Sequence, residues 1–401
     1  MSKNRFNPFT EQIAGKYFVG RESQLDLFIN RLNGLKSNVP NHLFIAGIHG
    51  TGKTSFLGRI SEIAKEHGLL SSITTLDTNK SGYEHVYSII RAIIKSIQES
   101  QKLRVGSKHN FLNDFDSGEN SQFFKFPKSK ILNSDYINED LVTIKELVLN
   151  QDKRGVVICI DEGQRIESSA LSALKNAIQN IDYCLIILSL RLVDSKGGIA
   201  NAGKAILEKI VKDGEGDYGA ARLFVNGIEI GPFETDQEAF ECVTKRLHNN
   251  VVQYKNEVIQ EIIKISERVP REIISLCSDL YNHSQEENIE FVDENAFNKM
   301  IRIIYESETA FIEGICSSIP QSQLNILYTL SQGNEMTILE IGKKLYPCID
   351  LLKSEYIKNG IEKDLLTLNE NFKIIKVNTE SKYSILKPIY TFLIKLYSYE
   401  S

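Results

Sequence analysis

The chain has 401 residues, a formal net charge of −5, a hydrophobic fraction of 42% and a charged fraction of 25%. This composition is that of a soluble globular protein, and the length exceeds one ordinary hydrophobic core, so we expect two or three domains. The acidic balance argues against broad binding of polyanions but allows a local basic surface.

The sequence carries no sign of a membrane or secretory destination. No apolar run reaches the roughly 18 residues that span a bilayer, and no apolar stretch follows Met1–Arg5, so we expect neither a membrane span nor a signal peptide. The six cysteines form no C-x-x-C pair, which favours reduced core residues over disulfides or zinc ligands. They are Cys159, Cys184, Cys242, Cys277, Cys316 and Cys348. We therefore expect a cytoplasmic protein.

The N-terminal region divides into a lead-in and a helix. Residues 1–16 have the composition of a poorly structured segment. The box Tyr17–Glu22 (YFVGRE) then precedes apolar residues at helical spacing, which predict a helix to about Leu35.

A glycine-rich segment is the strongest motif of the chain. The sequence GIHGTGKT at 47–54 fits G-x-x-x-x-G-K-[ST], the phosphate-binding loop. Leu43–Ala46 before it predicts a buried strand and Thr54–Glu66 after it predicts a helix, which is the setting that the motif requires. Glycines let successive N–H groups point at phosphate oxygens, and the helix N-terminus adds a favourable dipole. The segment therefore predicts binding of a nucleoside triphosphate.

The residue types of the loop predict individual roles. Lys53 would place its ammonium on the β- and γ-phosphates, and Thr54 would give its hydroxyl to Mg²⁺. The loop residues predicted to contact the nucleotide are Gly47, Ile48, His49, Gly50, Thr51, Gly52, Lys53, Thr54 and Ser55.

The box and the loop together resemble the AAA+ ATPases, particularly the origin-recognition (initiator) clade and its bacterial relatives. In that family an aromatic-Val-Gly-Arg-Glu box lies about thirty residues before the phosphate loop, beside the adenine. The resemblance implies that Phe18, Val19 and Arg21 contribute to nucleotide binding. The alternative is an ordinary helix N-terminus with Arg21 and Glu22 in its first turn.

The segment after the loop holds regular elements and then an insertion. Ser72–Leu76 predicts a second strand and Tyr83–Gln98 an amphipathic helix. Residues 100–135 then lose periodicity around Phe123–Pro127 (FFKFP), which predicts a disordered insertion or a functional loop. Aromatic rings among lysines can stack on single-stranded nucleic acid, but attachment of the loop to the surface through these rings is favoured.

A second nucleotide motif lies at the end of an apolar run. Val156–Ile160 predicts a central parallel strand whose C-terminal end, Asp161-Glu162, opens on a ligand crevice. Asp161 would hold Mg²⁺ through its water shell and Glu162 would polarise the attacking water as general base. The alternative is a buried strand followed by an acidic turn. The pair favours hydrolysis over simple switching, and the following Gly163–Ile166 continues the resemblance.

The resemblance also implies positions for the residues that sense the γ-phosphate. Ser189, at the end of the predicted strand Tyr183–Leu190, occupies the sensor-1 place, and its alternative is a serine satisfied by the backbone. An arginine before the last strand of the core, Ile228–Phe233, reaches the γ-phosphate of a neighbouring subunit in this family. Arg222 is the first candidate for that finger and Arg191 the second, with a plain surface arginine as the alternative.

The next segment resembles the helical lid of AAA+ proteins. Thr235 and Glu238 form an S/T-x-x-E capping box that opens a helix to Leu247. Further helices are predicted at about 255–267, 271–283 and 293–306. The resemblance places a sensor-2 arginine here. Because Glu267–Val269 replaces the usual glycine-containing turn, Arg268 and Arg271 both remain candidates, and Arg271 is favoured.

The C-terminal segment has the element order of a winged helix. Helices are predicted at 321–332, from the capping box at Thr337 and at 361–369, followed by strands at 372–377 and 382–386 and a final helix at 388–397. Residues 321–401 hold ten lysines, nine acidic residues and no arginine, which argues against strict sequence recognition. Lysines placed to meet phosphates are Lys358, Lys363, Lys373, Lys376 and Lys382. The alternative is a module that docks a protein or inhibits the core.

These observations predict an α/β P-loop NTPase of the AAA+ type with a parallel sheet. We expect a core at 1–233 with an insertion at about 100–135, a lid at 234–318 and a winged helix at 319–401. ATP and Mg²⁺ are the expected cofactors. Because a finger supplied in trans contributes about 10³–10⁵ in rate, hydrolysis is expected to need a second subunit.

Three functions remain open at this point. The first is an initiator-like ATPase that assembles on ATP binding and loads or remodels duplex DNA through the winged helix. The second is an ATP-driven switch of a bacterial antiphage or conflict system that controls an effector protein. The third is a transposon target-selection ATPase, for which a winged helix is unexpected.

Overall fold

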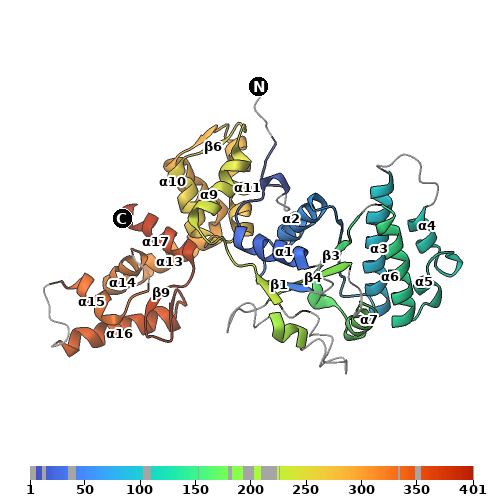
Figure 1. Cartoon of the computed structure of the whole chain (residues 1–401). Coiled ribbons are helices and arrows are strands. Elements are labelled where there is room, and N and C mark those ends of the chain that lie inside the picture. Colours follow the sequence, from blue (N-terminus) through green and yellow to red (C-terminus); the bar gives the residue numbers. More distant parts are fainter. Residues whose placement is uncertain are drawn as a thin grey trace. The chain divides into compact units, whose positions relative to one another are not determined.

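A computed structural model describes most of the chain in two compact units (Figure 1). The sheet unit comprises Glu11–Glu234 and Val269–Arg271, and the helical unit comprises Met1–Thr10, Thr235–Arg268 and Glu272–Ser401. The residues that the structure describes are 6–10, 15–34, 42–102, 110–151, 153–178, 183–192, 203–208, 224, 226–332, 335–347 and 354–400.

The sheet unit is built on five parallel strands in the order β2-β3-β4-β1-β5. The strands are β1 (Leu43–Gly47), β2 (Leu70–Thr75), β3 (Val156–Asp161), β4 (Cys184–Arg191) and β5 (Asn226–Glu229). β1 and β3 are buried along their whole length, and β4 is buried up to Leu190. Continuous apolar strands form here because helices cover both faces of the sheet. The predicted parallel α/β core is confirmed.

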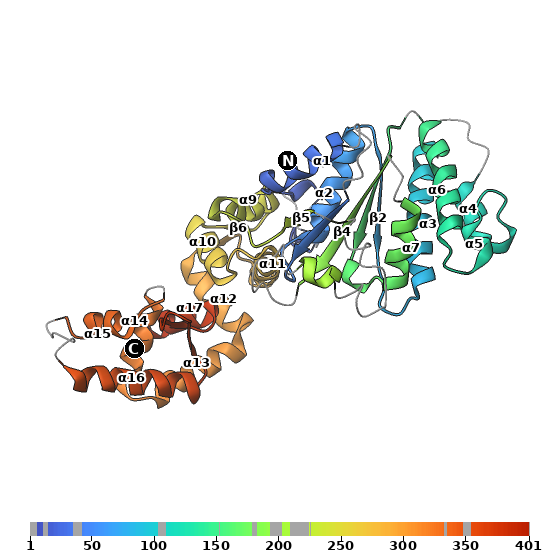
Figure 2. The ribbon, with the colours of Figure 1, turned by 60° about the horizontal axis from the view of Figure 1, so that its bottom comes forward.

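Helices lie on the two faces of this sheet (Figure 2). On one face, α1 (Glu22–Gly34) and α2 (Lys53–Glu66) pack against alternate strand residues such as Ile45 and Val157. On the other face, α3 (Gly82–Lys102), α6 (Ser134–Leu149) and α7 (Ser168–Ile178) pack against the intervening residues. The period of two along each strand thus divides the apolar side chains between two cores.

The described part of the insertion is folded. Residues 110–135 form α4 (Phe111–Asp116), a 3₁₀ turn and α5 (Phe126–Ser129). The rings of Phe115, Phe124 and Phe126 are fully buried in the core that α3 and α6 share. The predicted attachment through aromatic side chains is therefore confirmed. Stacking of Phe124 and Phe126 on nucleic acid is wrong, because neither ring reaches solvent.

Part of the lead-in also has a fixed place. Asn7 donates to Ser278 Oγ at 3.1 Å and to Asn282 Oδ1 at 2.8 Å. Phe9 is buried, with its ring stacked 6.3 Å from that of Tyr254. The prediction of a poorly structured lead-in is therefore wrong for residues 6–10, because they pack within the helical unit.

The first half of the helical unit contains more elements than the sequence predicts. Its elements are α9 (Asp236–Leu247), β6 (Gln253–Tyr254), α10 (Asn256–Ile265), α11 (Pro270–Glu286), β7 (Phe291–Val292), α12 (Glu294–Ile304) and α13 (Glu306–Ser318). The capping box of Thr235 with Glu238 has both of its hydrogen bonds. The parallel pair β6–β7 and the helix α13 were not predicted, since two-residue strands leave no periodic pattern.

The second half of the helical unit follows the predicted order. Its elements are α14 (Gln321–Ser331), α15 (Ile338–Leu345), α16 (Glu355–Glu370), β8 (Ile375–Val377), β9 (Tyr383–Ile385) and α17 (Pro388–Glu400). β8 and β9 pair antiparallel, and a bridge from Met336 to Tyr383 adds a third extended segment before α15. The capping box at Thr337 is present. α16 begins six residues earlier than predicted, at Glu355.

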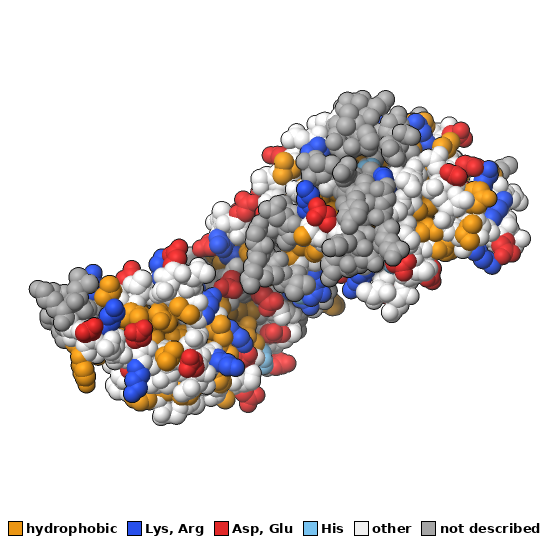
Figure 3. Space-filling view, turned by 90° about the horizontal axis from the view of Figure 1, so that it is seen from below, with side chains coloured by type: hydrophobic (Ala, Val, Ile, Leu, Met, Phe, Trp, Pro, Cys, Tyr) orange, Lys and Arg blue, Asp and Glu red, His pale blue; other side chains and the backbone are white. Residues whose placement is uncertain are grey.

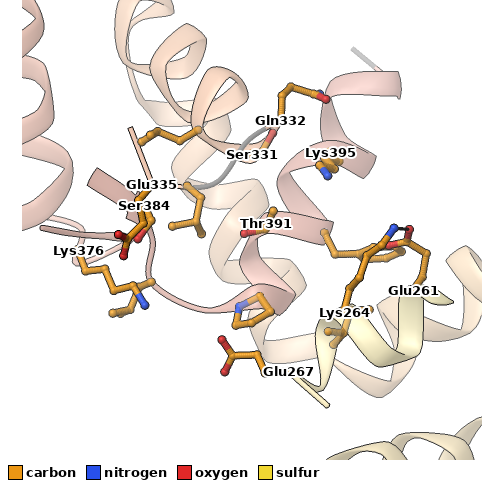
Figure 4. A pocket seen from close by; sticks show the side chains of 16 residues that line it. Glu261, Lys264, Glu267, Ser331, Gln332, Glu335, Lys376, Ser384, Thr391 and Lys395 are labelled. Atoms are coloured by element: carbon orange, nitrogen blue, oxygen red, sulfur yellow. Dashed lines mark hydrogen bonds and ion pairs between the residues drawn. The ribbon is translucent and has the colours of Figure 1, made fainter. Parts of the chain in front are cut away.

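A pocket of about 480 Å³ lies within the helical unit (Figure 4). α10 contributes Lys264 to its wall, and β9 and α17 contribute Ser384 and Lys395. Carboxylates such as Glu261 and Glu335 alternate with these lysines, so the wall favours neither an anion nor a cation. The pocket marks the place where α17 packs on the preceding helices.

The structure bears on two expectations from composition, which concern the cysteines and membrane-spanning helices. The five cysteines in the described ranges are free and buried, as predicted, and Cys348 lies outside those ranges. None of the helices formed by described residues combines the length and apolarity that a bilayer span requires.

Candidate nucleotide site

The glycine-rich loop lies between β1 and α2, where the sequence predicts it. Gly50 and Gly52 have φ angles of +86° and +91°, which residues with a side chain rarely adopt. A Cβ atom on Gly47 would lie 2.2 Å from the carbonyl oxygen of Ile230. The loop therefore needs glycine for its curvature and for its close approach to the residue after β5.

Lys53 points back into the loop. Its Nζ donates to the carbonyl oxygens of Gly47 and Ile48, both at 2.8 Å. Burial lowers the pKa of Lys53, Asp161 and Glu162 oppose this shift, and Arg191 adds to it. These effects place both carboxylates and the Arg191 guanidinium within electrostatic reach of the ammonium.

Thr54 and Asp161 come together at the first turn of α2. The Thr54 hydroxyl donates to Asp161 Oδ2 at 2.7 Å, and Asp161 is 5% exposed. Hydroxyl and carboxylate oxygens are the hard ligands that Mg²⁺ prefers, and an ammonium on a Gly-rich loop suits phosphate. The residues present therefore fit a Mg²⁺–triphosphate group.

Glu162 adopts a left-handed backbone conformation, with a φ of 54°, directly after β3. Its carboxylate accepts a hydrogen bond from Gln164 Nε2 at 2.6 Å and lies 3.4 Å from Arg165 Nη2. The charge of this carboxylate opposes the lowering of the pKa of Lys53 and of His49, both residues of the loop. The structure thus brings the predicted base and the predicted metal ligands together.

Arg271 lies on the loop. Its guanidinium contacts His49 Nε2, and its backbone N–H donates to the carbonyl oxygen of Gly50 at 3.1 Å. Arg268 instead lies 3.8 Å from Asp236, and Glu267 and Arg268 both have positive φ angles. The structure therefore brings the favoured candidate, Arg271, to the site, although its sensor role stays a prediction.

His49 is surrounded by positive charge. Burial lowers the pKa of His49, and the nearby Arg191, Arg271 and Lys53 lower it further. Three cationic side chains therefore act on the His49 ring, and the Glu162 carboxylate opposes their effect on its pKa.

The other predicted sensors have different outcomes. Ser189 is fully buried, and its hydroxyl has no hydrogen-bond partner among the described residues. Arg191, two residues further along β4, is exposed and lowers the pKa of Lys53 in its own chain. Arg222 lies outside the described residues. Of the two described residues, Arg191 is the one whose charge acts on the loop.

The box before α1 is tied to the loop by Arg21. Arg21 is 4% exposed, and its guanidinium donates to the carbonyl oxygens of Gly231 at 2.6 Å, Pro232 at 3.0 Å and Thr51 at 3.3 Å. Val19 is buried, and the ring centroids of Phe18 and Phe56 are 6.4 Å apart. These contacts fix the loop against the end of β5. The adenine contact of Phe18, Val19 and Arg21 stays a prediction.

Gln164 and Arg165 are functional candidates that the sequence analysis noted only as part of Gly163–Ile166, which continues the resemblance, and to which it gave no role. They lie on η4, a single 3₁₀ turn (Gly163–Arg165), which is too short to show a periodic pattern. Only their position directly after the Asp161-Glu162 pair marks them.

Comparison with known proteins agrees with this geometry. Residues 17–187 match the model of the AAA ATPase domain. An uncharacterized HTH-type transcriptional regulator of Methanocaldococcus jannaschii is 23% identical over 373 residues, which cover 86% of this chain and 83% of that protein.

Similar solved structures are Orc1 of Aeropyrum pernix in complex with DNA and RuvB, the Holliday junction branch migration motor of Thermotoga maritima. Orc1 is 14% identical with a TM-score of 0.43, covering 98% of this chain and 96% of its own. RuvB is 15% identical with a TM-score of 0.44, covering 96% of this chain and 98% of its own. The phosphate loop, the Asp161-Glu162 pair and the strands β1, β2 and β3 lie within residues 17–187, which match an AAA ATPase domain, the AAA+ class that the sequence predicted.

Proposed function

We propose that this chain binds Mg-ATP and hydrolyses it. The observation that carries the proposal is the hydrogen bond of 2.7 Å between Thr54 and Asp161, with Lys53 in the adjoining loop. Glu162 adds a carboxylate within electrostatic reach of Lys53. These four side chains are a complete set for holding phosphates, metal and water.

Each residue has a distinct task in this proposal. Bound Mg-ATP supplies the phosphoanhydride bond and the metal that neutralises its charge. Lys53 holds the phosphate end with its ammonium, and Thr54 and Asp161 hold the metal. Glu162 accepts a proton from the attacking water, which a carboxylate does well in a partly buried site.

Substitution of Thr54 tests the metal part of this proposal. Thr54→Ala removes the hydroxyl, whereas Thr54→Ser keeps it, so only the first should weaken Mg²⁺-dependent ATP binding. Calorimetric titration of ATP with and without Mg²⁺ measures the difference. Equal affinities for the two variants would contradict the metal role of Thr54.

We further propose that ATP binding orders an oligomer. In the AAA+ proteins that the chain resembles, the finger arginine comes from a neighbour, and Arg222 is the first candidate for it here. The hydrolysis rate per subunit should then rise with protein concentration, which light scattering and an ATPase assay follow together. A rate that is flat over a hundredfold concentration range would contradict the oligomer.

Duplex DNA is the partner that we propose for the C-terminal segment, taken as a winged helix at 319–401 after a lid at 234–318. Four lysines lie in or next to β8 and β9: Lys373, Lys376, Lys382 and Lys387. The turn between the two strands contains one acidic residue, Glu380. On the face of the helical unit in Figure 3, however, basic and acidic side chains are interspersed. The β8–β9 hairpin (Ile375–Ile385), which we call the wing, is therefore the part suited to phosphate contacts. The HTH-type name of the M. jannaschii relative supports a DNA-facing segment.

A second candidate is a switch that acts on an effector protein. The exposed residues of α16 include Glu355, Glu362 and Glu370 against Lys358 and Lys363. An acidic helix face repels the DNA backbone but suits a protein partner.

Tyr356 strengthens this second candidate because its side chain is 89% exposed on α16. Exposed aromatic side chains are enriched at protein interfaces. DNA binding that depends on salt separates the two candidates, since counterion release accompanies only contacts with phosphates.

A further inference from the structure

One amide side chain connects the predicted general base to the end of β4. Gln164 Nε2 donates to Glu162 Oε2 at 2.6 Å, and Gln164 Oε1 accepts from the backbone N–H of Arg191 at 2.9 Å. The donor end and the acceptor end of the amide are both used. A reversal of the amide would break both bonds, so its orientation is fixed.

The backbone that carries Gln164 is held at its neighbours. A Cβ atom on Gly163 would lie 2.4 Å from Leu188 Cδ1, so glycine allows this turn to pack directly on β4. Arg165 Nη1 donates to the carbonyl oxygen of Leu76 at 3.1 Å, and Ile166 is buried. Gln164 therefore projects from a turn with little freedom to move.

The other end of this connection lies beside the phosphate loop. Arg191 is the last residue of β4, and β4 pairs with β1 up to Gly47 and Arg191. The charge of Arg191 contributes to the lowered pKa of both Lys53 and His49. The backbone that Gln164 contacts is thus the backbone of the residue that pairs with Gly47, the first residue of the phosphate loop.

We propose that Gln164 is a positioning residue that orients the Glu162 carboxylate for hydrolysis and ties its place to the end of β4 at Arg191. This inference rests on the proposed ATP hydrolysis with Glu162 as the base. It predicts that Gln164 controls the rate of the chemical step and leaves ATP affinity unchanged, because the two hydrogen bonds of its amide go to the base and to the strand.

Two substitutions separate the two bonds of the amide. Gln164→Met keeps the length of the side chain but removes both bonds. Gln164→Glu keeps an oxygen for the Arg191 N–H while it places a carboxylate against Glu162. If Gln164 acts through Glu162, both variants should lower kcat about 10- to 100-fold, the range expected when a catalytic group is displaced by about 1 Å.

The measurements are kcat and KM for ATP, equilibrium affinity for ATP, and thermal unfolding as a check of folding. The expected result is a lower kcat with unchanged ATP affinity in both variants. A fall in affinity that matches the fall in kcat would overturn the inference, because it would show a general distortion of the site. Loss of kcat in Gln164→Met alone would also overturn it, since that pattern assigns the effect to β4 rather than to Glu162.

A double-mutant cycle with Glu162→Gln distinguishes this inference from the proposed function. In single turnovers with excess protein, Gln164→Met should slow the native chain but add no further loss in the Glu162→Gln chain. The same loss in both backgrounds would overturn the positioning role while Glu162 stays the base. Normal turnover by the Glu162→Gln variant would show that Glu162 is not the general base. A slow Glu162→Gln variant together with a normal rate for Gln164→Met would overturn only the positioning role of Gln164.

Discussion

The hydroxyl of Thr54 and the carboxylate of Asp161 form a hydrogen bond of 2.7 Å although 107 residues separate them in the chain. The sheet explains how they meet. β4 lies between β1 and β3, so α2 must reach over β4 to place its first turn at the end of β3. The carboxyl ends of parallel strands share one edge of a sheet, which is where such sites form.

Lys53→Ala should weaken ATP binding by at least about tenfold. Hydrogen bonds to charged groups contribute about 1.5–3 kcal/mol, and 1.4 kcal/mol corresponds to a factor of ten. Fluorescence titration with a labelled ATP analogue measures the affinity. Lys65→Ala, on an exposed position of the same helix, is the matched control and should bind normally. Retained affinity in Lys53→Ala would overturn the loop assignment.

Glu162→Gln should bind ATP and hydrolyse it about 10²–10⁴-fold more slowly, the range for loss of a general base. The slow chain should also accumulate in the ATP-bound assembled state, which analytical ultracentrifugation detects. Glu66→Gln, at the exposed end of α2, provides a control in which one carboxylate is lost far from the loop. Undiminished turnover in Glu162→Gln would remove it from the base role.

The local motifs of this site were predictable and its long-range contacts were not. The phosphate loop, the Asp161-Glu162 pair and the capping box at Thr235 each depend on residues a few positions apart. The contact of Arg271 with His49 joins residues 222 positions apart, and Arg21 reaches Gly231 across 210. No periodicity encodes such pairs, because they depend on how whole elements pack.

The same limit applies to the fold. The apolar runs of β1, β3 and β4 identified the core strands, since strands covered on both faces need no polar residue. The sequence predicted that aromatic side chains attach the insertion, but it did not predict the helices α4 and α5, because the aromatic residues there are spaced irregularly. Phe115, Phe124 and Phe126 are buried in the hydrophobic core that also contains residues of α3 and α6.

The buried His42 should make the protein sensitive to mild acid. Burial lowers the pKa of His42 to about 4, and its Nδ1 accepts from the backbone N–H of Ile186 at 3.0 Å. In the unfolded chain the pKa is about 6.5, so between pH 6.5 and 4 the unfolded state binds more protons. Stability should therefore fall as the pH drops through this window, by up to about 3 kcal/mol.

His42→Asn tests this expectation. Its side-chain oxygen can accept from the Ile186 N–H but does not titrate in this range. Urea unfolding at pH 7.5 and at pH 5 should show a smaller loss of stability in the variant than in the native chain. An equal loss in both would contradict the role of His42.

The buried Asp140 should have the opposite effect to His42, because its contribution to stability is largest at low pH. Burial raises the pKa of Asp140 to about 6, although the backbone N–H groups of Lys125 and Phe126 donate to it and oppose the shift. The folded state therefore binds more protons than the unfolded state between about pH 4 and 6, so the contribution of Asp140 to stability is lost as the pH rises through this range. The loss should reach about 2–3 kcal/mol.

Asp140→Asn removes this titration at the cost of one backbone hydrogen bond. The free energy of unfolding of the variant should therefore fall furthest below that of the native chain at pH 4. The difference between the two should be smaller at pH 7. Urea unfolding at both values measures the change, and Asp135→Asn in the first turn of the same helix is the control. A stability difference that does not change with pH would contradict the raised pKa.

Lysines of the wing should determine binding to duplex DNA. Lys373 and Lys376 flank the start of β8, and both side chains are exposed. Replacing them together by Lys373→Asn and Lys376→Gln keeps polar side chains, and asparagine tolerates the φ of 51° at position 373. DNA affinity should fall, and the slope of log K against log salt should decrease by about 0.9 for each phosphate that the variant no longer neutralises.

The matched control is Lys358→Gln with Lys363→Gln on α16, which removes the same charge from a helix rich in glutamate. This pair should change the salt slope less than the wing pair, because Glu355 and Glu362 already repel the DNA backbone near α16. Fluorescence anisotropy of a labelled duplex at 50 and 200 mM salt gives both slopes. A larger effect of the α16 pair would place the DNA on that helix, and the absence of binding at low salt would favour the protein effector.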